Sequence, residues 1–368
     1  MTNLTPIPIQ GDPSGDVFDV IIVGAGLAGL VCGQELQASG QRVLILEKSA
    51  GLGGRIATRR IGADCWLDHG VPAWMAPQGF DDFPDWPQWQ ALTTELLTKQ
   101  MIQAWPEFIP TQPLEPSYFQ AYAAPQGMTA IAKHLAPGLA IARQQRATNI
   151  HVNPDTQLWQ VTTLNSKELT QAWWSKTLVL AIPAPQAHAL CHPLSDQGLA
   201  REFLCHLGQV SYDPCLTVMV GFDPELGSAL PPLPRLALED PLIRWWAWDS
   251  QKRPQPAPPV IVLHSTPEYA QANLETVSLD EVGYTLWESV RKPYNLPDAL
   301  AIPNWLQVHR WRYAQVTQGY PRPYLAAPMS PTLICCGDWC GQTNKAWGLG
   351  RAWQSGIETA KRLKSPLP

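Results

Sequence analysis

Three glycines, Gly24, Gly26 and Gly29, follow an apolar run, and an acidic residue stands at Glu47. Glycines with this spacing allow a tight turn, a close approach of the backbone to a pyrophosphate, and packing of the next helix on the strand. The amino end of that helix can then bind phosphates through free N–H groups and its dipole, without lysine or arginine. A carboxylate at position 47 can accept hydrogen bonds from the hydroxyls of an adenosine ribose. It would repel a 2′-phosphate, so the pattern predicts a bound dinucleotide other than NADP.

The elements that must position these residues are visible on both sides of the glycines. Residues 18–23 have the length and β-branching of a buried parallel strand. The leucines and the valine of residues 27–36 fit one stripe of a helix, and Gly40 stands where a C-terminal cap belongs. Residues 42–46 predict the second strand. This context favours a nucleotide site over the alternative of an ordinary glycine turn.

A second glycine pair narrows the ligand. The sequence continues with Gly53-Gly54-Arg55, and here the chain resembles the flavin-containing amine oxidase superfamily, whose members carry a Gly-Gly-Arg loop directly after the acidic residue. The resemblance implies FAD, with this loop along its diphosphate and ribityl part. Arg55 would supply a charged fork for phosphate oxygens, and a solvated surface arginine is the alternative. The segment Lys48-Ser49-Ala50 departs mildly from the family pattern.

The far end of the chain carries the second motif of that superfamily. Gly337-Asp338-Trp339 follows a short buried strand and precedes a helix through residues 352–360. In the superfamily, the Gly-Asp pair closes on the ribityl phosphate, and the final helix points its amino end at the flavin. A helix dipole there stabilises the charge that reduced flavin gathers. Arg351 stands where relatives have glycine.

The fold class predicted from these motifs is α/β: a discontinuous Rossmann-like FAD-binding domain with an α+β substrate domain built on an antiparallel sheet. We expect residues 1–73, 126–187 and 321–368 to form the FAD domain, and residues 74–125 and 188–320 to form the substrate domain. The predicted cofactor-binding residues are Gly24, Ala25, Gly26, Leu27, Ala28, Gly29, Glu47, Lys48, Gly53, Gly54, Arg55, Gly70, Gly337, Asp338, Leu349 and Gly350.

Composition excludes several other functions. The chain has 368 residues, 45% of them hydrophobic, which favours two domains. A net charge of −5 without basic runs makes nucleic acid an unfavourable partner. No apolar run approaches the roughly 20 residues of a membrane span, and the first 16 residues do not resemble a signal peptide. The eight cysteines are scattered, which favours a reducing cytoplasm and predicts no metal site.

The sequence has no second dinucleotide-binding motif. The electrons that reduce the flavin must therefore come from a small molecule bound at the substrate domain. Tryptophan accounts for 17 residues, and flat aromatic walls suit a flat or cationic ligand, although core packing is the alternative for each ring. Trp245 and Trp246 fall on one predicted strand and face opposite ways if alternation holds.

Three central strings resemble the renalase-like branch of the superfamily: Ser211-Tyr212-Asp213-Pro214-Cys215, His264-Ser265-Thr266-Pro267 and His309-Arg310-Trp311-Arg312-Tyr313-Ala314. The resemblance implies non-covalent FAD, since no cysteine stands where some relatives tether theirs. It also implies oxidation of dihydro isomers of NAD(P), with hydride passing to flavin N5. Oxygen would be the acceptor and hydrogen peroxide the product.

We expect substrate positioning by His69, Trp246, His264 and Arg312. A dihydropyridine gives up hydride without first losing a proton, so stacking in a reactive geometry is the main task of these residues. Structural hydrogen bonds are the alternative for each histidine and for the arginine. Two other functions stay open: an amine or carotenoid-type oxidoreductase on the same fold, or a non-catalytic binding protein of the Rab-escort type.

Overall fold

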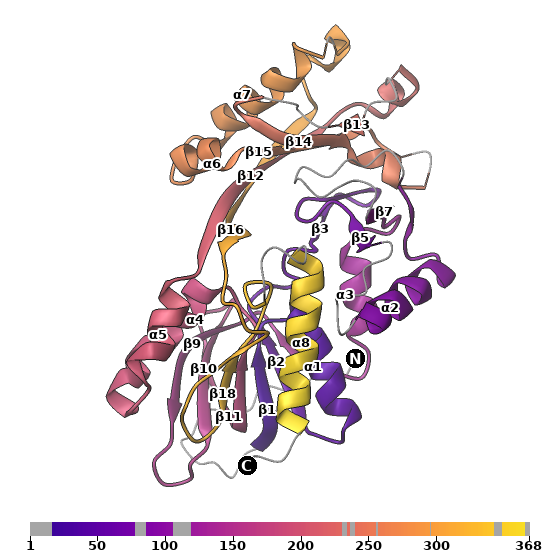
Figure 1. Ribbon diagram of the computed structural model, residues 1–368. Helices are drawn as coiled ribbons and strands as arrows, with labels where there is room; N and C mark the ends of the chain where they lie inside the picture. The colour runs from indigo at the N-terminus through magenta and orange to yellow at the C-terminus, as the bar shows by residue number, and fades with distance from the viewer. Residues whose placement is uncertain are drawn as a thin grey trace. The chain divides into compact units, whose positions relative to one another are not determined.

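The structure is a computed structural model that forms two compact units (Figure 1). It describes residues 17–77, 86–105, 119–229, 234–235, 240–254, 257–294, 296–341 and 348–364. Unit 1 comprises Met1–Gly54, Ala132–Ser211 and Val316–Pro368, and unit 2 comprises Arg55–Ile131 and Tyr212–Gln315.

Unit 1 is built on an eight-stranded sheet with a parallel centre. Strands follow one another in the order β17-β18-β11-β1-β2-β8, and β10 and β9 continue from β11. The pairs β1/β2, β1/β11, β2/β8 and β11/β18 are parallel, while β9, β10 and β17 pair antiparallel. The strands are β1 (Val17–Val23), β2 (Val43–Glu47), β8 (Ala140–Arg143), β9 (Gln145–Val152), β10 (Trp159–Asn165), β11 (Thr170–Leu180), β17 (Leu325–Ala326) and β18 (Leu333–Cys335).

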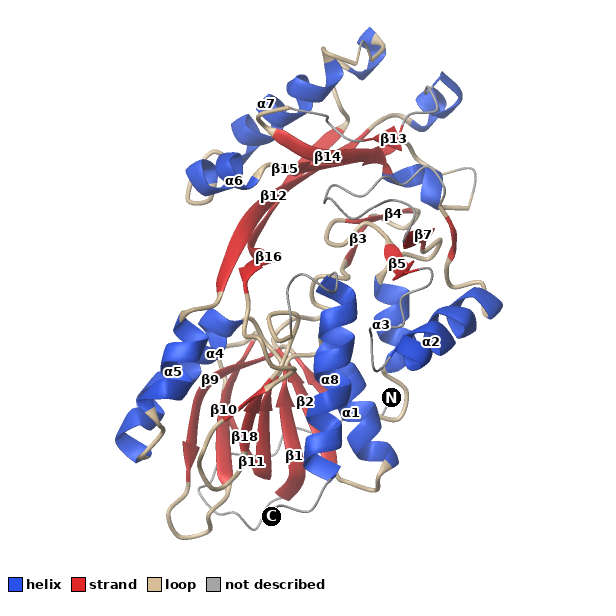
Figure 2. Ribbon diagram, viewed as in Figure 1, coloured by secondary structure: helices blue, strands red, loops and turns tan. Residues whose placement is uncertain are grey.

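Helices α1 and α8 lie side by side along this sheet (Figure 2). A Cβ built on Gly356 of α8 would lie 2.5 Å from the Ala28 carbonyl oxygen of α1, so the two backbones touch. The predicted apolar stripe of α1 is buried, and so are Cys32 and Gly33; a Cβ on Gly33 would lie 3.0 Å from Ile45 of β2, so this glycine faces the sheet. The helices of unit 1 are α1 (Leu27–Ala38), α3 (Thr129–Leu135, which starts just before the unit does), α4 (Ala184–Cys191), η2 (His192–Gln197), α5 (Arg201–Gly208) and α8 (Gly348–Lys364).

Unit 2 contains an antiparallel sheet in the order β13-β14-β15-β12-β16, a β3/β4 hairpin and a small β5-β7-β6 sheet. Its strands are β3 (Thr58–Ile61), β4 (Cys65–Asp68), β5 (Trp74–Pro77), β6 (Gln103–Ala104), β7 (Phe119–Ala123), β12 (Ser211–Gly221), β13 (Pro234–Arg235), β14 (Ile243–Trp248), β15 (Val260–Ser265) and β16 (Trp305–Gln318). Its helices are α2 (Trp86–Thr98), η3 (Pro224–Ala229), η4 (Asp249–Lys252), α6 (Pro267–Asn273), α7 (Leu279–Arg291) and η5 (Asp298–Leu300).

The two faces of the larger sheet of unit 2 have different neighbours. One face packs Trp246 and Leu263 against Trp287 of α7, and α6 and α7 cover it (Figures 1 and 2). The opposite face packs Trp245 and Val262 in a second apolar cluster with residues of the hairpin and the small sheet. Strand alternation divides the side chains between these two clusters.

The strands predicted over residues 18–23 and 42–46 are present as β1 and β2, Trp245 and Trp246 share β14 as expected, and the Rossmann-like fold class is confirmed. The unit boundaries differ from the expected domain bounds. Residues 188–211 lie in unit 1, since α4 packs against both α5 and β9 there. Residues 55–73 lie in unit 2, because β3 and β4 form its hairpin.

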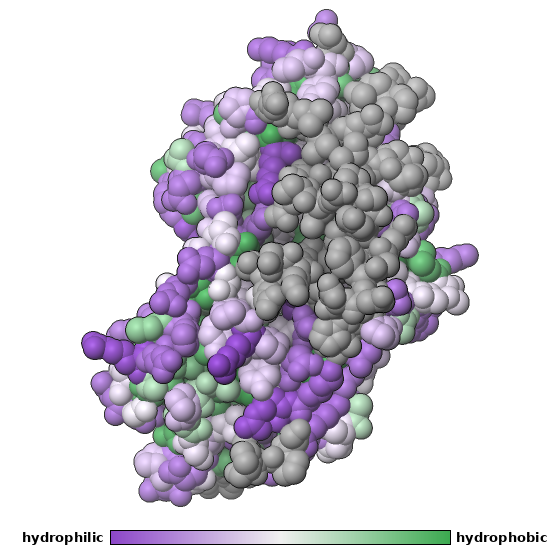
Figure 3. Space-filling model, in the orientation of Figure 1, coloured by the Kyte–Doolittle hydropathy of each residue, from purple (hydrophilic) through white to green (hydrophobic). Residues whose placement is uncertain are grey.

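The described surface is mainly hydrophilic in the view of Figure 3, with hydrophobic residues in small groups. Within the described part of the chain, the helices lack the length and apolarity to cross a membrane. The same residues hold no group of three or more His, Cys, Asp and Glu side chains placed to share a metal ion.

Candidate active site

Unit 1 gathers the predicted nucleotide-binding glycines where its parallel strands end. Gly24 has a φ of +108°, and its N–H donates to the Leu46 carbonyl oxygen at 2.8 Å. A Cβ on Gly24 would lie 2.5 Å from the Ala181 carbonyl oxygen, and one on Gly29 would lie 2.0 Å from that of Gly24. A Cβ on Gly26, by contrast, would meet no described atom within 4 Å. Packing therefore demands glycine at 24 and 29, whereas Gly26 leaves open space beside the turn.

Glu47 closes β2 next to this turn. Its carboxylate is buried and accepts the N–H of Ala25 at 2.8 Å and that of Ser49 at 2.7 Å. Each carboxylate oxygen can accept more than one hydrogen bond, so acceptor capacity is left for ribose hydroxyls. Gly53 donates to the Ala25 carbonyl oxygen at 2.8 Å and forms a bridge with Gly26. The second glycine loop therefore lies against the first.

The C-terminal motif reaches the same edge of the sheet. β18 pairs parallel with β11, and Gly337 follows it with a φ of +148° and an N–H that donates to Ser355 Oγ on α8 at 2.9 Å. Asp338 is buried, and a Cβ on Gly348 would lie 3.8 Å from its Oδ2. A carboxylate thus lies at the amino end of α8. The first and last motifs meet in unit 1, as one cofactor cradle requires.

Unit 2 contains a cluster of three histidines and two tryptophans, which we call the histidine cluster: His69, Trp245, His264, His309 and Trp311. The His69 ring centroid lies 4.9 Å from that of His309 and 5.4 Å from that of Trp311. The Trp311 indole N–H donates to the His69 carbonyl oxygen at 2.8 Å. His264 lies opposite Trp245 across β14 and β15, with ring centroids 5.0 Å apart. His69 also acts electrostatically on His264, so the cluster connects the turn after β4 with strands β14, β15 and β16.

The three histidines are uncharged at neutral pH. Burial lowers the pKa of His69 to about 4, helped by His309 and by the positive charge of Arg59. Burial also lowers the pKa of His264 to about 3, and burial with Arg59 lowers that of His309. Among the described residues, the buried His69 Nδ1 and His264 Nε2 have no hydrogen-bond partner. The cluster thus offers neutral imidazoles with unused hydrogen-bonding atoms.

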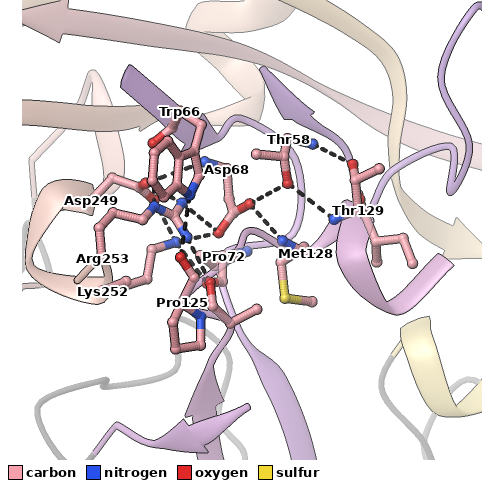
Figure 4. A network of polar contacts seen from close by, with 12 residues as sticks. Thr58, Trp66, Asp68, Pro72, Pro125, Met128, Thr129, Asp249, Lys252 and Arg253 are labelled. Carbon is pink, nitrogen blue, oxygen red and sulfur yellow. Dashed lines mark hydrogen bonds and ion pairs between the residues drawn. The ribbon is translucent and has the colours of Figure 1, made fainter. Parts of the chain in front are cut away.

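Four buried charged side chains come together at Asp68, the residue before His69 (Figure 4). Lys252 Nζ forms ion pairs with Asp249 and, at 2.9 Å, with Asp68, and Arg253 pairs with the same two carboxylates. Lys252 also donates to the Pro72 carbonyl oxygen at 3.1 Å. Burial alone would raise the Asp68 pKa, but the two cations hold it well below its usual range. We call these four residues the charge network, and its formal charges cancel.

The charge network connects separate segments of unit 2. Asp68 Oδ1 accepts the Met128 N–H at 2.8 Å, and Arg253 donates to the Ala124 carbonyl oxygen at 2.6 Å. Figure 4 shows the bonds from Thr58, Met128, Lys252 and Arg253 meeting at the Asp68 carboxylate. Because His69 follows Asp68 in the chain, the network fixes the turn that carries His69.

Comparison with protein families decides the class of this chain. Residues 99–364 match the model of flavin containing amine oxidoreductases, which is more than half of the chain. Residues 22–90 match an NAD(P)-binding Rossmann-like domain. The chain belongs to the flavin-containing amine oxidoreductase family. The family model describes flavin-containing amine oxidoreductases.

Solved structures share the fold at low sequence identity. A triple mutant of putrescine oxidase superposes with a TM-score of 0.61 at 14% identity, covering 94% of this chain and 98% of the other. A protein from Exiguobacterium sp. 255-15, described as a protoporphyrinogen oxidase, gives a TM-score of 0.62 at 12% identity over 94% of this chain and 98% of its own.

Curated relatives match over short segments only. An L-amino-acid oxidase of Siganus canaliculatus is 39% identical over 67 residues, and an L-amino acid dehydrogenase of Synechocystis sp. is 37% identical over 76. A lysine-specific histone demethylase homolog of Oryza sativa subsp. japonica is 51% identical over 57 residues. These matches cover 16%, 21% and 16% of this chain, and 13%, 16% and 8% of the relatives.

The cofactor of this family is FAD, and unit 1 fits its nucleotide part. Glu47 has acceptor capacity for ribose hydroxyls, and the open space at Gly26 lets a diphosphate approach the turn that begins α1. When bound, FAD supplies an acceptor for a hydride. The protein's own part is to hold the nucleotide, orient the donor and keep water away.

The predicted cofactor residues fall in both units. Unit 1 contains Gly24, Ala25, Gly26, Leu27, Ala28, Gly29, Glu47, Lys48, Gly53, Gly54, Gly337, Asp338, Leu349 and Gly350, and unit 2 contains Arg55 and Gly70. Lys48 is exposed. Arg55 Nη1 lies 3.3 Å from the carbonyl oxygens of Tyr313 and Ala314, so part of its fork binds β16. Their roles toward FAD stay predictions.

Two predicted substrate residues lie away from the histidine cluster. Trp246 is fully buried on the helix-covered face of the sheet, where its ring meets Tyr294. The neighbouring Trp245, on the other face, contacts His264. Arg312 is exposed and pairs with Glu275 at the surface. Strand alternation thus separates Trp246 and Arg312 from the two predicted histidines.

Sequence reasoning missed the charge network. Its Lys252 and Arg253 directly precede a proline-containing stretch, yet both side chains are buried. The only signal was two adjacent basic residues beside Asp249 in an otherwise apolar region. Trp311 and His309 belong to one of the renalase-like strings, but their spacing in the sequence does not predict that they contact His69.

Proposed function

We propose that this protein is a renalase-like FAD-dependent oxidase. Its substrate is a small planar hydride donor, a dihydro isomer of NAD(P), and the hydride passes to flavin N5. Oxygen is the acceptor and hydrogen peroxide the product. All eight cysteines are free, which is consistent with a reducing compartment such as the cytoplasm.

The observation that carries this proposal is the uncharged histidine cluster. A dihydropyridine loses hydride without prior loss of a proton, so it needs flat walls and hydrogen bonds rather than a charged base. Trp245 and Trp311 offer indole rings for packing against a flat donor. The unpartnered His69 Nδ1 and His264 Nε2 can bond the carboxamide of a nicotinamide.

The second candidate is oxidation of an amine. The family name, the putrescine oxidase fold and the two amino-acid-oxidising relatives favour it. Against it, the charges outside the neutral charge network that act on these two histidines are positive: Arg59 acts on His69, and Arg244 acts on His264. A protonated amine would be repelled there.

Steady-state turnover tests the proposal. Purified protein carrying FAD is given oxygen with 2- or 6-dihydro isomers of NAD, with putrescine, or with L-amino acids. We expect oxygen uptake and equimolar hydrogen peroxide with the dihydro isomers alone. Turnover confined to putrescine or to amino acids would instead establish the second candidate.

A further inference from the structure

Two arginines border the histidine cluster without an ion partner. Arg59 lies on β3 and Arg244 on β14, and both side chains are half-buried. Within the described chain neither guanidinium has a hydrogen bond or an ion pair, whereas Arg253, Arg291 and Arg312 all pair with carboxylates. A half-buried guanidinium without a partner is available for an anionic ligand.

Arg59 points toward the apolar cluster that contains Trp245. It lies opposite Leu67 in the β3/β4 hairpin, and side chains of such a pair share one face. Leu67 is fully buried and packs in the same cluster as Trp245. The next residue, Arg60, lies on the other face, where its guanidinium stands 5.7 Å over the Trp66 ring. Arg59 and Arg60 thus face opposite ways.

Arg244 is turned by a β-bulge. Ile243 pairs with Ser265 and Trp245 with His264, so that Arg244 has no partner residue on β15. Ile243 belongs to the helix-covered core, while Trp245 contacts His264 on the opposite face. Bulges of this kind re-aim a side chain and are frequent beside active sites. Here the bulge lets Arg244 share the face of Trp245.

The electrostatics agree with this placement. The charge of Arg59 acts on His69 and His309, and that of Arg244 acts on His264. Arg244 also interacts with Asp213, a partly buried carboxyl whose pKa is raised by burial and lowered by the charge of Arg244. The cluster is therefore bordered by the positive charges of two arginines.

We propose that Arg59 and Arg244 bind the phosphate of a nucleotide substrate whose ring lies in the histidine cluster. A guanidinium presents N–H donors in a planar fork that matches phosphate oxygens. This inference rests on the proposed function and deepens it: the two arginines select phosphorylated dihydronicotinamides over uncharged ones.

Binding of oxidised ligands to the FAD-loaded protein tests this without turnover. Nicotinamide mononucleotide and nicotinamide riboside differ by one phosphate, and each is titrated while the flavin absorbance is followed. We expect the mononucleotide to bind at least about tenfold more tightly than the riboside, as for one charge-assisted contact. Arg59→Met and Arg244→Met should each remove most of that difference and leave riboside affinity unchanged.

Arg60→Met is the matched control, because it removes an adjacent arginine that faces Trp66 instead. It should keep the full preference for the mononucleotide. Equal affinity of the wild type for the two ligands, or an unchanged preference in both arginine variants, would overturn the inference. A third contradicting result would be an L-amino acid that changes the flavin absorbance of the wild type but not of the two arginine variants, when the mononucleotide changes neither.

Failure of the proposed function is separable from failure of this inference. If dihydronicotinamide riboside and mononucleotide both reduce the flavin but bind alike, the function stands and the phosphate site is wrong. If neither reduces it, the function is wrong. Melting temperature and FAD content, measured for every variant, distinguish a lost contact from a misfolded protein.

Discussion

At the level of single residues, the neutral state of the histidines follows from where they are buried. His69 is 8% exposed, so its imidazole is largely removed from water. This removal destabilises the charged form of the ring more than the neutral form. Arg59 adds repulsion to the same effect. The unfolded chain has neither constraint, so stability must depend on pH in a defined direction.

We expect the free energy of unfolding to fall as pH decreases from about 6.5 toward 4. In this window the unfolded chain binds a proton at His69 that the folded chain, with a pKa of about 4, refuses. The slope is about 1.4 kcal/mol per pH unit for each such group. Urea unfolding at several pH values measures it. His69→Gln should flatten the slope, while the exposed His192→Gln should not. Identical slopes for wild type and His69→Gln would contradict the buried neutral state.

Removal of one charge from the charge network should be costly. Lys252→Met leaves the carboxylates of Asp68 and Asp249 with Arg253 alone, at a site where Lys252 is 1% exposed. We expect a loss of about 3–5 kcal/mol in the free energy of unfolding. Adding Asp249→Asn restores neutrality and should recover part of it. A single variant as stable as wild type would show that the network is not held as described.

At the level of elements, two glycines of the turn between β1 and α1 have different roles, one in packing and one in cofactor binding. A Cβ on Gly29 would lie 2.0 Å from the Gly24 carbonyl oxygen, while a Cβ on Gly26 would meet no described atom within 4 Å. Two alanine substitutions three residues apart should therefore fail for different reasons.

Gly29→Ala should lower the melting temperature of the apoprotein, because the turn must shift to relieve the contact. Gly26→Ala should leave that melting temperature unchanged, yet weaken FAD binding by at least about tenfold, since the methyl group occupies space beside the turn. Differential scanning fluorimetry and FAD titration measure the two effects. If the Gly26→Ala protein binds FAD as tightly as the wild type does, the diphosphate does not bind at this turn.

The same elements show what sequence can predict. The glycine turn, β1 and β2 can be predicted from short-range rules, because strand, turn and helix are contiguous in the sequence. Each glycine of the turn is required by its immediate neighbours. The histidine cluster could not be assembled this way, since His69, Trp245 and His309 lie far apart in the chain. The spacing also could not show which of Trp245 and Trp246 belongs to the histidine cluster. Strand alternation places them on opposite faces of the sheet, but only the position of α6 and α7 shows which face these helices cover.

At the level of the whole molecule, each unit has its own task. Unit 1 has the turn, acid and helix end that hold a nucleotide, and unit 2 has the neutral, aromatic cluster that suits a flat donor. Family membership fixes the cofactor, while the uncharged histidine cluster carries the proposal on substrate. The central claim is therefore that a dihydronicotinamide, and no protonated amine, delivers electrons to the flavin.

Anaerobic mixing tests that claim most directly, since it removes oxygen from the question. The FAD-loaded protein is mixed with a 6-dihydro isomer of NAD, and separately with putrescine or an L-amino acid, while the visible flavin absorbance is recorded. We predict rapid bleaching by the dihydro isomer and none by the amines. Bleaching by an amine, with the flavin unchanged by the dihydro isomer, would contradict the account.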